Sequence, residues 1–155
     1  MLDGPDHSAP PINPLPRTVA FLSLLVAAVE IFFQLGERGI IGGPEAIGWR
    51  TAAALDYGFS GRGLAWMIEN GRYPADLLLR FLTYPLIHGG FVHAAFVVVF
   101  LLALGKMVGE TLGEVAVLAT TLVPAIVGAM AYGLLLDDPV VLIGGYPAVY
   151  GLIGA

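Results

Sequence analysis

The chain contains no cysteine, so neither a disulfide framework nor a thiolate metal site or nucleophile is available to it. Only 12% of its 155 residues are charged, and seven of these are Lys or Arg. The net charge of -5 comes from scattered carboxylates, and without a basic stripe for phosphates we expect no nucleic-acid partner. Serine is equally scarce, because Ser8, Ser23 and Ser60 are the only three and all lie in the first half of the chain.

Apolar residues are abundant instead: they make up 57% of the chain, and the mean hydropathy is +0.84. We therefore expect an all-α fold, a polytopic transmembrane helical bundle. Apolar runs predict spans at about 18–35, 93–109 and 115–136, because roughly 20 helical residues cross a hydrocarbon core about 30 Å thick. The last run, 147–155, has only nine residues and predicts an incomplete span, so we expect the chain to be the amino-terminal part of a longer protein.

Two segments outside these spans differ in character. Residues 1–17 are polar and contain five prolines, which predicts a disordered tail ahead of one membrane domain, 18–155. The stretch 36–79 mixes glycine and arginine with tryptophan and tyrosine, a composition typical of an interfacial loop. We expect two short helices in this loop, one opening at Pro44 and another over Gly63–Asn70, closed by the glycine that follows.

Glu30 interrupts the first predicted span. An ionisable residue within a span suggests function, but Glu30 lies only five residues from the end of this span, so we expect it to reach headgroups or water. In the next two spans small residues recur at every fourth position, a spacing that lets helices approach closely in lipid. They are Gly105, Gly109 and Gly113 in one span and Ala125, Ala129 and Gly133 in the other.

A set of polar and small residues recurs in order from position 80 to the end of the chain. An arginine and a threonine precede two histidines, a glycine lies within the second span, and a glycine-rich stretch opens the last run. These are Arg80, Thr83, His88, His93, Gly105 and Gly144-Gly145-Tyr146-Pro147, continuing to Gly151. Over residues 80–155 the chain resembles the rhomboid family of intramembrane serine proteases.

The resemblance implies a site at the start of the fourth span. Rhomboids place a serine there in a GxSG turn and pair it with a histidine of the sixth span. The second loop histidine and an asparagine four residues later stabilise the oxyanion. By position, His88 and His93 match the two loop histidines, and Gly144 and Gly145 match the first half of the turn. The partner histidine would lie beyond Ala155.

Three positions depart from the family pattern: Tyr146 replaces the serine, Pro147 replaces the following glycine, and Val97 replaces the asparagine. A phenol of pKa near 10 on a rigid ring is a poor substitute for a primary hydroxyl activated by a base. Proline removes a backbone N–H and valine removes a side-chain donor, and losing one oxyanion donor typically costs about 100- to 1,000-fold in rate. We therefore assign no catalytic residue.

Two other interpretations of the histidine pair stand beside this one. Two histidines five positions apart on one helix point about 140° apart, and without a third ligand we expect no metal site and no cofactor. In a structural role, His93 caps or hydrogen-bonds within the bundle and His88 ties down its loop. The resemblance instead favours a retained role for both in lining a polar cavity with Gly144, Gly145 and Tyr146.

Three functions follow as hypotheses. The first is a pseudoprotease that binds transmembrane segments of client proteins within the lipid bilayer. The alternatives are an active intramembrane serine-type endopeptidase and a structural subunit of a membrane complex. The resemblance implies a bacterial inner membrane and a cytoplasmic amino terminus, whereas the arginines of the first loop favour the opposite orientation. The sequence leaves the oligomeric state open.

Overall fold

The structure, a computed structural model, describes residues 14–136 and 139–155, and its regular elements are helices. Three of them are long and apolar enough to cross a membrane: α1 (Arg17–Glu37), α5 (Phe91–Leu112) and α6 (Glu114–Leu135). The predicted fold class, an all-α membrane bundle, is confirmed. The predicted disordered tail falls mostly on residues 1–13, outside the described part of the chain.

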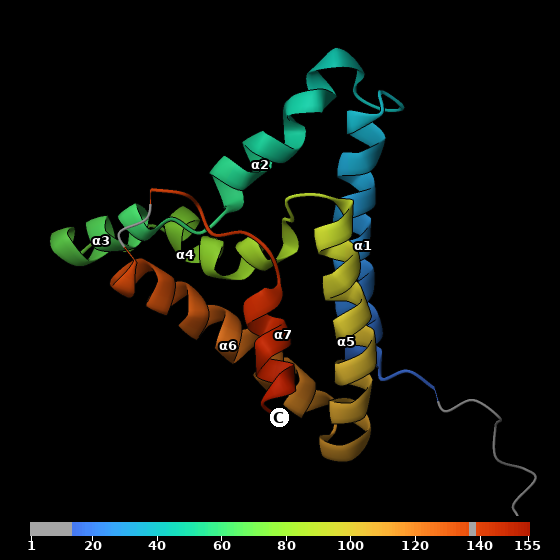
Figure 1. Cartoon of the computed structure of the whole chain (residues 1–155). Coiled ribbons are helices and arrows are strands. Elements are labelled where there is room, and N and C mark those ends of the chain that lie inside the picture. The colour runs from blue at the N-terminus through green and yellow to red at the C-terminus, as the bar shows by residue number, and fades with distance from the viewer. Residues whose placement is uncertain (1–13, 137–138) are drawn as a thin grey trace, which may run out of the picture.

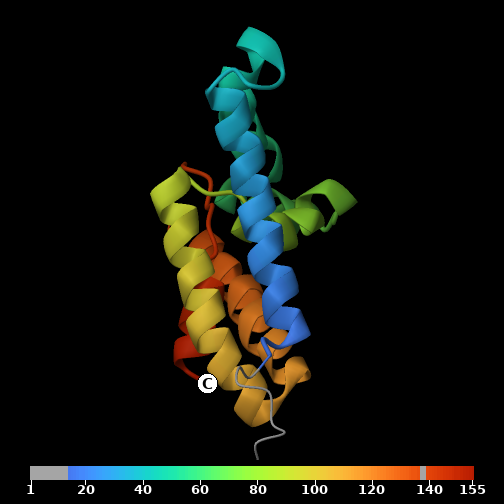
Figure 2. The same cartoon turned by 90° about the vertical axis from the view of Figure 1, so that its right-hand side faces the viewer.

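The long helices frame the short helix α7 (Tyr146–Ile153). α1 and α5 lie side by side along their lengths, and α6 runs obliquely away from the foot of α5 (Figure 1). α7 stands between α6 and α5 and packs against both. Both views show that the C-terminal turns of α1 extend beyond the start of α5 (Figure 2). The C-terminal turns of α1 therefore contact the loop that follows, through η1 and α2.

That first loop is largely helical. It contains, in order, η1 (Gly43–Gly48), α2 (Trp49–Tyr57), α3 (Gly61–Asn70), α4 (Ala75–Thr83) and η2 (Tyr84–Leu86). The helix predicted at Pro44 begins as η1, and α3 ends as predicted at Gly71, whose φ is 59°. α4 was not predicted, although Asp76 in its first turn is an ordinary start signal.

Glycines bring the helices close together, as their spacing predicted. A Cβ atom on Gly105 of α5 would lie 3.0 Å from Val19 of α1, and one on Gly133 of α6 would lie 2.8 Å from Leu64 of α3. Gly151 packs α7 directly against the backbone of α6. Gly113 serves differently, since it ends α5 with a φ of 91°.

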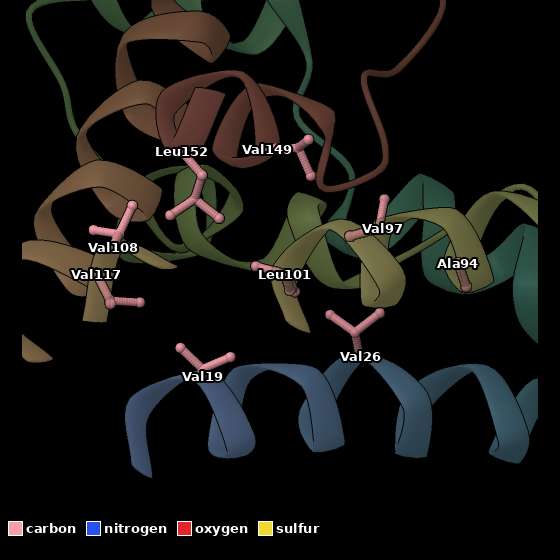
Figure 3. Close-up of a cluster of buried hydrophobic side chains, with 9 residues drawn as sticks. All are labelled: Val19, Val26, Ala94, Val97, Leu101, Val108, Val117, Val149 and Leu152. Carbon is pink, nitrogen blue, oxygen red and sulfur yellow. The ribbon is translucent and has the colours of Figure 1, made fainter. Parts of the chain in front are cut away.

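One buried apolar cluster joins α1, α5, α6 and α7 (Figure 3). Val19 and Val26 of α1 point toward α5, where Leu101 and Val97 meet them. Val149 of α7 belongs to the same cluster. α7 is therefore anchored by packed aliphatic side chains. The site described next lies at the start of α7, where Tyr146 packs against this cluster.

Candidate functional site

His88 lies in the loop between η2 and α5 and is only 1% exposed. Its Nε2 accepts a hydrogen bond from the backbone N–H of Gly145 at 3.3 Å, so this nitrogen carries no proton. Its backbone carbonyl accepts a hydrogen bond from Nη1 of Arg50 at 2.8 Å. Burial, followed by the nearby imidazole of His93, lowers the pKa of His88 to about 4. His88 is therefore a neutral acceptor near pH 7.

Tyr84 holds the same region from the other side. Its hydroxyl donates to the carbonyl of Ala125 on α6 at 2.8 Å, and its own carbonyl accepts the N–H of Gly144 at 3.0 Å. The side chain is fully buried, and this burial raises the pKa of the phenol. Tyr84 thus ties η2 to α6 and to the segment that opens α7.

His93 occupies the first turn of α5. Its Nδ1 accepts the N–H of Gly89 at 3.3 Å, which places the proton of a neutral ring on Nε2. Its ring meets that of His88 edge-on, with centroids 4.9 Å apart, and stacks on that of Tyr146 at 5.1 Å and 16°. Among the described residues, His93 Nε2 is buried without a hydrogen-bond partner.

Tyr146 is the first residue of α7, and its ring also stacks on Tyr150, with centroids 6.2 Å apart. Val97, one turn after His93, is buried, and its Cγ1 would lie 2.8 Å from a Cβ atom on Gly145. The positions where the resemblance implies a hydroxyl and an amide therefore present a stacked ring and a methyl surface.

The helical geometry assumed for the histidine pair was wrong. His88 precedes α5 and only His93 lies on it, so the two rings touch instead of pointing apart. In the part of the chain that the structure describes, no group of three His, Cys, Asp or Glu side chains gathers with metal-binding geometry.

The remaining motif residues hold the first loop. Arg80 Nη1 donates to the carbonyls of Leu55 at 2.9 Å and Gly58 at 3.3 Å. The Thr83 hydroxyl donates to the carbonyl of Tyr57 at 2.8 Å. Both side chains therefore fasten the end of α2 to α4. Gly105 and Gly151 act at helix contacts, as described above.

Sequence reasoning missed a buried ion pair beside the site. The prediction that Glu30 reaches headgroups or water is wrong, because Glu30 is 4% exposed and pairs with Arg50 at 2.7 Å. The spacing of Glu30, Gln34 and Glu37, four and then three residues apart, marks a polar stripe on α1. Nothing in the sequence selects its partner from the five arginines of the first loop.

The second half of the chain, which contains the histidine site, matches a known protein family. The rhomboid domain family matches residues 75–155, which is more than half of the chain and runs from α4 to α7. No curated protein and no solved structure matches the chain. The matched range contains both histidines, Val97 and the glycine-rich stretch before α7.

Proposed function

This chain belongs to the rhomboid family, and from that membership and the site geometry we propose that it is a non-catalytic member that binds transmembrane segments of client proteins. The observation that carries the proposal is the ring of Tyr146. By the resemblance it corresponds to the family nucleophile, and it stacks on the ring of His93 with centroids 5.1 Å apart. A stacked phenol offers no flexible primary hydroxyl to attack a peptide carbonyl.

Apart from His93 Nε2, which is buried without a hydrogen-bond partner among the described residues, the surrounding groups support the same conclusion. The Gly145 N–H is bonded to His88 Nε2 rather than directed at a free position where an oxyanion would develop. Val97 supplies no donor, and the ring of Tyr146 lies against the face of His93. Transition-state stabilisation requires preorganised donors pointing at the developing charge. The site therefore favours binding over hydrolysis.

The aromatic stack supplies a surface for clients. It leads from His93 through Tyr146 to Tyr150, whose side chain is 66% exposed on α7. Ile153, one turn later, is 60% exposed. Helices associate in lipid through close packing and polar contacts, and a tyrosine offers a ring for the first and a hydroxyl for the second. We place client contact on this face of α7.

A cleavage assay tests the loss of catalysis. The chain, reconstituted in vesicles with a single-span substrate, is expected to leave the substrate intact and to take up no fluorophosphonate probe. Cleavage that disappears in Tyr146→Phe would instead establish the alternative, an active endopeptidase that uses the phenol. The Phe variant is a matched control because it keeps the ring stack and removes only the hydroxyl.

Photocrosslinking tests client binding. A photoreactive residue at Tyr150 is expected to capture a single-span peptide in vesicles at least several-fold more efficiently than one at Val115, which is 79% exposed at the start of α6. Excess unlabelled peptide should compete. Equal capture at both positions would refute the binding surface. Capture in cells of a single stoichiometric partner that no peptide displaces would favour the structural-subunit hypothesis.

A further inference from the structure

Arg50, the second residue of α2, uses every N–H of its guanidinium group. Nη1 and Nη2 donate to the two carboxylate oxygens of Glu30 at 2.7 and 2.9 Å. Nε and Nη2 donate to those of Glu37 at 2.6 and 3.3 Å. Nη1 also donates to the carbonyl of His88 at 2.8 Å. A guanidinium has five N–H donors, and these five hydrogen bonds account for all of them.

The Glu30 side of this cluster is shielded from solvent, whereas the Glu37 side chain is 34% exposed. The side chains of Arg50 and Glu30 are 12% and 5% exposed, and Gln34 donates a further hydrogen bond to Glu30 at 2.9 Å. The guanidinium also lies 5.1 Å from the centre of the Phe33 ring. An ion pair taken out of water is tolerated only when its geometry is good and its remaining donors are satisfied, and both conditions are met here.

One of the five hydrogen bonds goes neither to α1 nor to a carboxylate. The bond to His88 reaches the residue whose ring receives the Gly145 N–H directly before α7. The carbonyl and the ring belong to the same residue, so fixing the carbonyl restricts where the ring can lie. Since the guanidinium is a rigid planar fork, its two carboxylate contacts on α1 determine where this donor points.

We propose that Arg50 is the positioning residue of the histidine site, connecting the first-loop helix α2 and the upper turns of α1 to the start of α7 through His88. A displacement of α2 relative to α1 would then move the ring nitrogen of His88 that accepts the Gly145 N–H. This inference concerns the geometry of the site and is independent of client binding. Its failure would leave the crosslinking result at Tyr150 unaffected, so the two proposals are separable.

The experiment follows the Gly145 amide and the His88 imidazole by NMR on the full chain in detergent micelles. In Arg50→Lys the positive charge remains but the planar fork is lost. We expect the Gly145 amide to exchange at least about tenfold faster and the His88 Nε2 resonance to lose the shift of a hydrogen-bonded acceptor. A purely electrostatic role would leave both signals unchanged in this variant, and that result would overturn the proposal.

Two further variants keep the test decisive. If Arg50→Lys does not fold, the double variant Glu30→Gln with Arg50→Gln removes both buried charges together, which cores tolerate better than one unpaired charge. It lacks the fork as well, so it should show the same loss at Gly145. Lys106→Gln disrupts an ion pair with Glu110 on α5 that lies outside this cluster, and it should retain wild-type exchange. Wild-type exchange at Gly145 in the double variant would also refute the proposal.

Discussion

Gly144 is constrained twice. Its φ of +99° lies in a region that side-chain-bearing residues rarely adopt, and a Cβ atom there would lie 2.5 Å from the ring of His93. Gly145 has an ordinary φ of -85° but meets Val97, so its constraint is space alone. Neighbouring glycines can therefore be required for different reasons, and together they let His88 and His93 reach the start of α7.

At the same scale, the buried imidazole of His88 predicts a pH dependence of stability. The ordinary pKa of histidine is 6.5, whereas that of His88 in the folded chain is about 4. Between these values the unfolded chain binds a proton that the folded chain does not, so stability is complete above pH 6.5 and declines as the pH falls. From pH 7 to pH 5 we expect a loss of about 2 kcal/mol, measured as a lower Tm in detergent.

His88→Gln provides the control for this prediction. A glutamine oxygen can accept the Gly145 N–H in place of Nε2 but does not titrate in this range. The variant should therefore show a smaller decrease in Tm between pH 7 and pH 5 than the wild type. An equal decrease in the two proteins would mean that other groups cause the acid sensitivity.

Among the elements, those with a strong local signal were predictable and those defined by a partner were not. The three long helices followed from long apolar runs, and α3 followed from a glycine stop at Gly71. α4 was missed because its nine residues are short for an apolar run, and it is held by contacts with α2, η2 and α6. The burial of Glu30 was misjudged because Arg50, which comes 20 residues later, reaches it only in the folded chain.

The contact between α1 and α5 gives a test at this scale. Leucine at Gly105 must displace Val19, because even its Cβ atom would lie 3.0 Å from that side chain. Such overpacking typically costs about 1–3 kcal/mol, so Gly105→Leu should lower the Tm. Ala103→Leu adds bulk on an exposed face of the same helix and should leave the Tm nearly unchanged. Equal effects of the two substitutions would contradict close packing at Gly105.

For the whole molecule, the sequence predicted a membrane bundle and the order of its spans, but not how the first loop meets the site. A short antiparallel bridge joins Phe59 to Leu142, with backbone hydrogen bonds of 3.0 and 2.8 Å. Together with the hydrogen bond from the Gly144 N–H to the Tyr84 carbonyl it holds the loop against the segment before α7, and Arg50 is linked to this segment through His88. These contacts join positions 38 to 83 residues apart, and no local pattern in the sequence encodes such pairings.

The same contacts change how the arginines of the first loop count toward the orientation of the bundle. Five arginines in the first loop would place that loop in the cytoplasm by the positive-inside rule. Two of them have partners inside the protein: Arg50 pairs with carboxylates and Arg80 donates to backbone carbonyls. We therefore follow the family and propose that the amino terminus is cytoplasmic and the first loop lies on the opposite side.

Single-cysteine labelling tests this orientation without background, because the chain has no cysteine of its own. Arg72→Cys replaces an exposed residue of the first loop, and Leu112→Cys lies at the turn between α5 and α6, on the side of α1's start. Glu114 at that turn accepts a hydrogen bond from the Arg17 N–H at 2.8 Å, which places the turn with the amino terminus. A membrane-impermeant maleimide should label Arg72→Cys in intact cells and Leu112→Cys only after lysis. The reverse pattern would show that the arginine count, rather than the family, determines the topology.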